Sequence, residues 1–153
     1  MSDSITVEVC VENRAGALAA LQAGAQRVEL CAALDLGGVT PSAGEIESAL
    51  EVGIETVVLI RPRAGDFVYD ADEVRVMRRD MERAWDMGVR SFAIGALTPT
   101  GDLDRAALSA LTEVGRGTPE DPGTLCCHRA FDGTRDPRAA LELLVELGFA
   151  RLL

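Results

Sequence analysis

Two short segments of this sequence each place a carboxylate and a thiol two residues apart. Glu8 and Cys10 lie within one apolar run, and Glu29 and Cys31 repeat the pattern further along the chain. Both runs are rich in valine and leucine, which is typical of β-strands, and a strand points every second side chain to the same face. We therefore expect each carboxylate to share a face with the thiol that follows it.

Thiols at the ends of two neighbouring strands suit a soft metal ion. Adjacent strands lie about 4.8 Å apart, so Cys10 and Cys31 could reach one ion. Thiolates select Cu(I) over Mg²⁺ or Ca²⁺, and Cu(I) accepts two ligands, whereas a structural zinc site needs about four. The alternative is that both thiols are inert members of the core.

His128 is the only histidine of the chain, and it ends a later apolar run. Three roles are open for it: a third metal ligand, a general acid or base, or a core histidine whose hydrogen bonds are satisfied. Glu8 and Glu29 are the other candidates for proton transfer, since both are expected on inward faces of strands.

Two arginines, Arg61 and Arg63, follow the third apolar run and are separated by one proline. A guanidinium binds a carboxylate or phosphate through two parallel hydrogen bonds, so the pair is a candidate anion site. The alternative is that both arginines pair with Glu8 and Glu29 and fill the interior, because a lone buried charge is costly. We favour the ion pairs.

A recurring pattern of glycine followed by an apolar residue organises the chain around these groups. A helix-like pattern precedes each such glycine and a strand-like pattern follows it, because glycine suits the left-handed position that ends a helix. The four positions are Gly24, Gly53, Gly88 and Gly148, and Gly115 is expected to end a further helix. Repeated strand–helix units of about 30 residues predict a parallel sheet.

The expected strands span about 5–11, 27–31, 55–61, 91–97 and 123–128, and a sixth begins at about 150. The expected helices span about 14–23, 42–52, 72–87, 103–114 and 137–147, the last with Asp136 as its N-cap and Pro137 at its first position. No glycine-rich dinucleotide loop is present, which favours a (β/α) barrel. A closed barrel has about eight strands. We therefore predict an incomplete TIM-type (β/α) barrel of five units plus the start of a sixth strand.

Composition places the chain among ordinary globular proteins. The 153 residues are 48% hydrophobic and 26% charged, which predicts a single domain over residues 1–153. No apolar run approaches the ~20 residues of a membrane span, and residues 1–4 lack the features of a secretory signal, so we expect a cytoplasmic protein with free thiols.

The net charge is −10 and all 15 basic residues are arginine, which argues against nucleic acid and membranes as partners.

Five motifs together resemble the CutC copper homeostasis family. They lie at residues 8–11, 27–32, 37–42, 60–67 and 128–132, and read EVCV, RVELCA, GGVTPS, IRPRAGDF and HRAFD. The resemblance covers the whole chain, and it implies a TIM-type barrel, a cytoplasmic location and copper binding. Cys10 and Cys31 match the two strand-end cysteines proposed as copper ligands in that family.

The chain departs from the family pattern in three places. Ala64 stands where the family usually has a second glycine, and Cys126 and Cys127 replace the usual Thr-Phe. The strands that would correspond to a seventh and an eighth are missing. A homo-oligomer could cover the two sheet edges that this leaves open.

Three functions remain open at this point. The first is cytoplasmic Cu(I) binding through the two strand-end cysteines. The second is an enzyme that acts on an anionic small molecule, and the third is an inactive, truncated family member that is molten or self-associates. The enzyme would use side chains that meet at one rim of the barrel, namely Glu8, Glu29, Arg61, Arg63 and His128.

Overall fold

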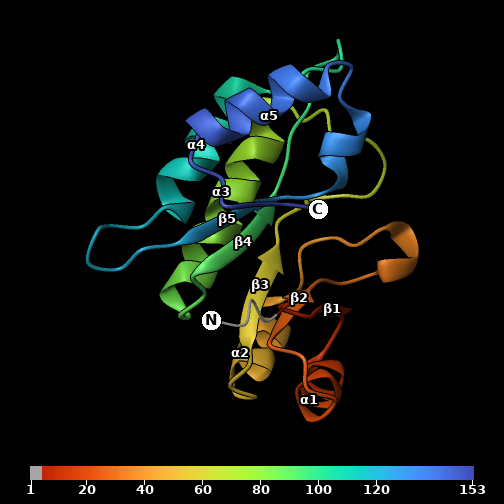
Figure 1. Ribbon diagram of the computed structural model, residues 1–153, viewed down its shortest axis with the longest axis vertical. Helices are drawn as coiled ribbons and strands as arrows, with labels where there is room; N and C mark the ends of the chain where they lie inside the picture. Colours follow the sequence, from red (N-terminus) through yellow and green to blue (C-terminus); the bar gives the residue numbers. More distant parts are fainter. Residues whose placement is uncertain (1–4) are drawn as a thin grey trace.

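The computed structural model describes residues 5–153, which form one curved parallel sheet with the α-helices along one face (Figure 1). The spatial order of the six strands follows the chain from β1 to β6, and all neighbouring strands pair in parallel. The incomplete (β/α) barrel is therefore confirmed. The expectation that residues 1–4 are not a secretory signal concerns a segment outside the described residues.

The elements alternate along the chain as the repeat predicted. The strands are β1 (Glu8–Val11), β2 (Arg27–Leu30), β3 (Glu55–Leu59), β4 (Ser91–Ile94), β5 (Thr124–Cys127) and β6 (Arg151–Leu152). The α-helices are α1 (Arg14–Gln22), α2 (Ala43–Leu50), α3 (Ala71–Asp86), α4 (Arg105–Gly115) and α5 (Pro137–Glu146). Two 3₁₀-helices that the sequence pattern did not predict are η1 (Leu34–Leu36) and η2 (Arg129–Gly133).

Several strands end earlier than expected because the chain beyond them pairs with a loop. The N–H of Thr40 donates to the carbonyl of Arg61 at 2.9 Å, and its hydroxyl accepts from the N–H of Arg61 at the same distance. Ala32 and Val39 form an antiparallel bridge just after β2. These bonds fix the loops that rise from the carboxyl ends of β2 and β3.

Helix ends follow the glycine pattern with one exception. The four glycines expected to end helices have φ values between +76° and +105°, and they are Gly24, Gly53, Gly88 and Gly148. Gly115 ends α4 as predicted, as its last residue, but the left-handed residue that follows the helix is Gly117, with φ +62°. Gly115 packs so closely on β5 that a Cβ there would lie 2.4 Å from Leu125 Cδ2.

Alternate residues of the strands pack in two separate apolar layers. One layer lies between sheet and helices and includes Leu30, Phe92 and Cys127. The other lines the inner face of the curved sheet and consists of Cys31, Val57, Leu59, Ala93 and Cys126. Leu30 and Cys31 therefore lie on opposite faces of the sheet, as the alternation predicts.

Helix starts are capped by side chains. Asp136 accepts hydrogen bonds from the N–H groups of Arg138 and Ala139, as predicted, with Pro137 at the first helical position of α5. Asp70 and Glu73 form a reciprocal capping box at the start of α3. None of the helices in the described part of the chain has the length and apolar character that a membrane crossing requires.

Candidate functional site

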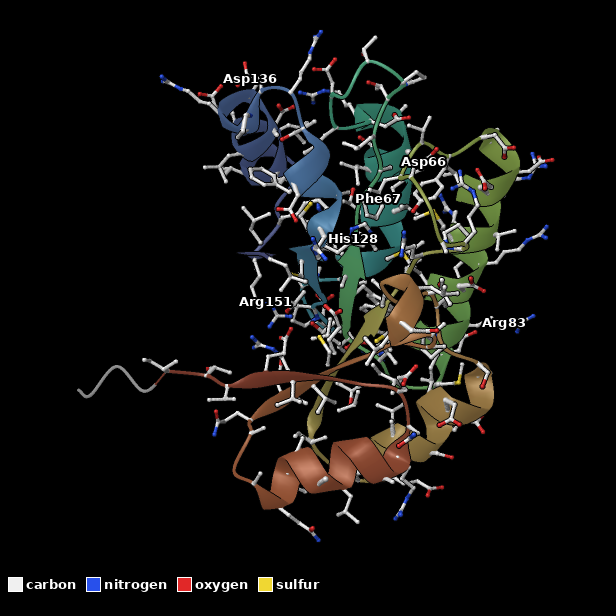
Figure 2. All side chains as sticks on the ribbon, turned by 90° about the vertical axis from the view of Figure 1, so that its right-hand side faces the viewer. Asp66, Phe67, Arg83, His128, Asp136 and Arg151 are labelled. Carbon is white, nitrogen blue, oxygen red and sulfur yellow. The ribbon has the colours of Figure 1, made fainter. Side chains whose placement is uncertain are left out.

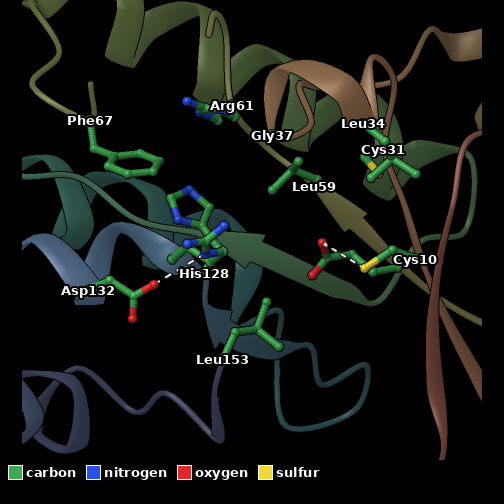
Figure 3. A pocket seen from close by; sticks show the side chains of 12 residues that line it. Cys10, Cys31, Leu34, Gly37, Leu59, Arg61, Phe67, His128, Asp132 and Leu153 are labelled. Atoms are coloured by element: carbon green, nitrogen blue, oxygen red, sulfur yellow. Dashed lines mark hydrogen bonds and ion pairs between the residues drawn. The ribbon is translucent and has the colours of Figure 1, made fainter. Parts of the chain in front are cut away.

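A cavity of about 500 Å³ opens at the carboxyl ends of the strands, on the inner face of the sheet (Figure 3). In a parallel barrel this end carries the functional groups. Figure 2 places Phe67 and His128 together above the middle strands. The lining residues are Cys10, Glu29, Cys31, Leu34, Gly37, Leu59, Arg61, Phe67, His128, Arg129, Asp132 and Leu153.

Cys10 lies at the open side of this cavity, next to a carboxylate. It is opposite Glu29 in the register of β1 and β2, and its thiol donates to Glu29 Oε1 at 3.9 Å. Burial raises the pKa of the Cys10 thiol, and the negative charges of Glu29 and Glu8 raise it further. Cys10 is therefore a protonated, accessible thiol at neutral pH.

Cys31 follows β2 directly and lies deeper in the same cavity. Its side chain is buried, and its thiol donates to the carbonyl of Val11 at 3.6 Å. Burial raises the pKa of Cys31 to about 12, with a further contribution from the negative charge of Glu29. The fold thus brings both predicted thiols to one cavity, from adjacent strands and on one face.

Glu29 is a buried carboxyl beside the thiol of Cys10. Only 6% of the residue is exposed, and its Oε2 has no hydrogen-bond partner within residues 5–153. Burial raises the pKa of Glu29 to about 7, the charge of Glu8 adds to this, and the positive charge of Arg151 opposes it. Glu29 can therefore exchange a proton near neutral pH.

Glu8 does not line the cavity, although it was a candidate for proton transfer. It lies opposite Arg27 in the register of β1 and β2, and the two side chains form an ion pair. Arg27 also approaches Glu55 of β3 at 3.5 Å. Glu8 therefore belongs to an ion-pair ladder at the amino ends of the strands, outside the cavity lining.

Arg61 lies in the cavity wall but is not paired with a carboxylate. Its Nη1 donates to the carbonyls of Leu36 at 3.2 Å and Gly38 at 2.8 Å, and its Nη2 donates to that of Gly65 at 2.6 Å. The expected ion pairs with Glu8 and Glu29 are wrong. The guanidinium instead donates to carbonyl oxygens of the loops after β2 and β3, and these bonds hold it away from both strand carboxylates.

Arg63 lies outside the cavity lining, in a set of bonds of its own. It forms ion pairs with Glu73 and with Asp66, the latter at 3.0 Å, and its Nη2 donates to the carbonyl of Val68 at 2.7 Å. Its guanidinium lies over the ring of Tyr69. In a regular strand, residues 61 and 63 would point to the same side. The chain bends at Pro62, so the two arginines do not lie in the same site.

His128 is buried at the end of β5. Its Nδ1 accepts a hydrogen bond from the N–H of Ala130 at 3.2 Å, whereas its Nε2 has no partner in the described chain. Burial lowers the pKa of His128 to about 4, and the positive charge of Arg61 lowers it further. The imidazole is therefore neutral at pH 7.

Two further residues complete the environment, and the sequence pattern did not single them out. Phe67 places its ring 5.1 Å from that of His128 and 4.9 Å from the guanidinium carbon of Arg61. Arg151 of β6 donates to Ser91 Oγ at 2.5 Å beneath the cavity. The one signal for Phe67 was its place as the last residue of the motif at residues 60–67.

Within residues 5–153 no group of three or more His, Cys, Asp or Glu side chains is arranged to hold a metal ion. The four cysteines are free thiols. Cys10 and Cys31 both line the cavity.

Comparison with known proteins gives one consistent family. The model of the CutC family matches residues 5–153. A CutC family protein of Agrobacterium fabrum is 47% identical over 147 residues, and one of Mesorhizobium japonicum is 44% identical over 148 residues. The crystal structure of a CutC protein from Streptococcus agalactiae matches with a TM-score of 0.85 and 37% identity.

The matches cover nearly all of this chain but only part of the relatives. Each of the two sequence matches spans 96% of this chain, and they span 57% and 55% of the respective relatives. The structural match spans 97% of this chain and 71% of the Streptococcus agalactiae chain. The part that is shared includes the strands that carry both thiols and the histidine.

Proposed function

Since the chain belongs to the CutC family, we propose that it binds Cu(I) through the thiolates of Cys10 and Cys31. The Streptococcus agalactiae relative is named as a candidate copper homeostasis protein. We extend the proposal to copper handling in the cytoplasm, where free thiols such as these four stay reduced.

One observation carries the proposal: two thiols from adjacent strands line the same cavity. Cys10 is exposed and Cys31 is buried, so an ion that enters from solvent would meet Cys10 before Cys31. Soft thiolates favour Cu(I), and two sulfur ligands suffice for it. Harder divalent ions need more donors than these residues supply.

Protons must leave both thiols when the ion binds. Burial keeps the pKa of each thiol above its ordinary value, so both are protonated at pH 7 in the metal-free protein. Glu29 accepts the hydrogen bond of the Cys10 thiol, so its carboxylate is placed to receive that proton. Cys10 and Cys31 would thus hold the ion, and Glu29 would receive the proton of Cys10. The buried position of Cys31 shields its thiol from water.

An anaerobic competition titration with a Cu(I) chelator tests the proposal. We expect the reduced protein to bind one Cu(I) per chain tightly, and the Cys10→Ser/Cys31→Ser double variant to lose that binding. Cys127→Ala is the matched control, because this thiol is buried on the helix side of the sheet and should leave binding unchanged. Equal binding by the double variant would refute the proposal.

A further inference from the structure

The cavity wall holds buried polar atoms that have no partner. Among residues 5–153, five side-chain nitrogen or oxygen atoms are buried without a hydrogen bond, and three of these belong to the cavity-lining residues Glu29, Arg61 and His128. Such an atom is destabilising, because the hydrogen bonds that it loses to water on folding are not replaced, and native structures leave few of them. Because three of these residues line one cavity, we expect a ligand to supply the missing hydrogen-bond partners.

Arg61 is a buried cation without a counter-ion. It is the one buried arginine of the described chain, with 6% of its surface exposed, and no carboxylate of that part of the chain lies within 4.0 Å of it. Three carbonyl dipoles hold Nη1 and Nη2, but the Nε–H has no acceptor. A desolvated charge held only by dipoles favours the entry of an anion.

His128 adds a second donor beside Arg61. Because its Nδ1 accepts the N–H of Ala130, the proton of the neutral ring lies on Nε2, and that N–H has no acceptor. The ring is held in place, since Phe67 lies over it and a Cβ at Gly95 would come within 2.6 Å of its Cε1. The donor is therefore fixed before any ligand arrives.

Arg61 and His128 line a cavity that also has apolar walls. The ring of Phe67 contacts both the imidazole of His128 and the guanidinium of Arg61, so these groups lie around one aromatic side chain (Figure 3). Leu59 and Leu153 line the same cavity. A ligand with an anionic end and a short apolar body matches this distribution.

We propose that the cavity binds a small organic monocarboxylate, with its oxygens accepting from Arg61 Nε–H and His128 Nε2–H and its apolar body against Leu59 and Phe67. This inference goes beyond copper binding, because it uses neither thiol. The charge count selects a monoanion. Arg61 supplies one uncompensated positive charge, the charge of Arg129 is paired with Asp132 at 3.2 Å, and the chain as a whole carries −10.

Arg63 provides a matched control two residues away. Its guanidinium is paired with Glu73 and Asp66 and does not line the cavity. Arg61→Lys keeps the charge but removes the Nε–H donor, so it should weaken carboxylate binding at least ~10-fold. Arg63→Lys should leave binding unchanged.

The test is a ¹H–¹⁵N NMR titration of the single imidazole, which needs no assignment because the chain has one histidine. The probes are butyrate, its neutral amide butyramide, and inorganic phosphate. We expect the free protein to show the Nε2–H tautomer, and butyrate to shift the Nε2 signal to saturation. Butyramide and phosphate should leave it in place.

The outcomes are decisive even where Arg61→Lys does not fold, because the titration of the unmodified chain stands alone. An imidazole signal that butyrate does not move, or moves no more than butyramide does, overturns the proposal, as does tighter saturation by phosphate. The Cys10→Ser/Cys31→Ser variant should bind butyrate normally. Retained butyrate binding in that variant, with Cu(I) binding lost, separates this site from the copper proposal.

Discussion

The two cavity thiols differ in exposure and in the group that accepts their hydrogen bond. Cys10 is exposed beside the carboxylate of Glu29, whereas Cys31 is fully buried and bonded to the carbonyl of Val11. An ion reaching Cys31 must replace a hydrogen bond and remove a proton whose pKa is about 12. Removing the proton from Cys31 therefore costs more free energy than removing it from an ordinary thiol.

The first prediction concerns the pH dependence of Cu(I) affinity. Both thiols are protonated at neutral pH, so each bound ion displaces two protons. The affinity should rise about 100-fold for each pH unit between pH 6 and pH 8, because each displaced proton contributes a factor of ten. Chelator competition at several pH values measures the slope. A flat profile would mean that the thiols are not the ligands.

The second prediction concerns Glu29, whose folded pKa of about 7 lies above the ordinary value of 4.5. The folded chain binds this proton more tightly than the unfolded chain does. The resulting stabilisation is complete below pH 4.5 and is lost as the pH rises through 7. Glutamine does not titrate, so the Glu29→Gln variant does not show this decrease. Between pH 5 and pH 8 the free energy of unfolding of the wild type should therefore fall by up to about 3 kcal/mol relative to that of the variant.

Urea unfolding of the wild type and Glu29→Gln at both pH values measures this difference. The comparison cancels the other titrating groups, including His128, whose lowered pKa acts in the opposite sense. Parallel stability profiles for the two proteins would show that Glu29 is solvated like an ordinary surface carboxylate.

At the scale of elements, the loops after β2 and β3 shape the cavity. Gly38 lies in the first loop with φ +82°, and a Cβ there would meet Leu59 Cδ2 at 2.8 Å and Cys31 Cβ at 3.4 Å. Its carbonyl also accepts from Arg61 Nη1. This glycine therefore joins the thiol side of the cavity to the arginine side.

The third prediction compares two glycines of neighbouring segments. Gly38→Ala should destabilise the fold by about 1–3 kcal/mol, because alanine is strained at positive φ and would displace Leu59. Gly44→Ala should stabilise it by up to about 1 kcal/mol, because Gly44 lies in α2 with open space around it. Urea unfolding measures both. Equal effects would contradict the assigned loop conformation.

The sequence predicted what depends on local periodicity. Alternation placed Cys10, Glu29 and Cys31 on the inner face, and glycine after each helix fixed the βα repeat, because both are short-range properties of the backbone. Partner choice could not be predicted, because it depends on which loops fold over a side chain. Arg61 donates to loop carbonyls, whereas Arg63 forms an ion pair with Glu73. The spacing of the two arginines in the sequence does not distinguish these environments.

At the scale of the whole molecule, the sheet has two open edges, at β1 and β6. The outward side chains near β1 are apolar and exposed, with Ile5 at 88%, Val7 at 51% and Val9 at 37%. Open parallel edges beside exposed apolar side chains favour pairing with another chain.

The fourth prediction is that the isolated 153-residue chain self-associates through β1. Sedimentation velocity should show a weight-average mass that rises with concentration, and Val9→Lys should reduce it by placing a charge on the exposed face. Val145→Lys is the control, because Val145 is 69% exposed on α5, away from β1. A concentration-independent monomer mass for the wild type would contradict the prediction.

The central claim is that two thiolates from adjacent strands hold one copper ion. X-ray absorption spectroscopy of the protein loaded with one Cu(I) tests it most directly, because it reports the number and type of donor atoms. We predict a two-coordinate Cu(I) with sulfur donors alone, and loss of that spectrum in the Cys10→Ser/Cys31→Ser variant. A nitrogen donor from His128, or the same sulfur coordination in the double variant, would contradict the claim.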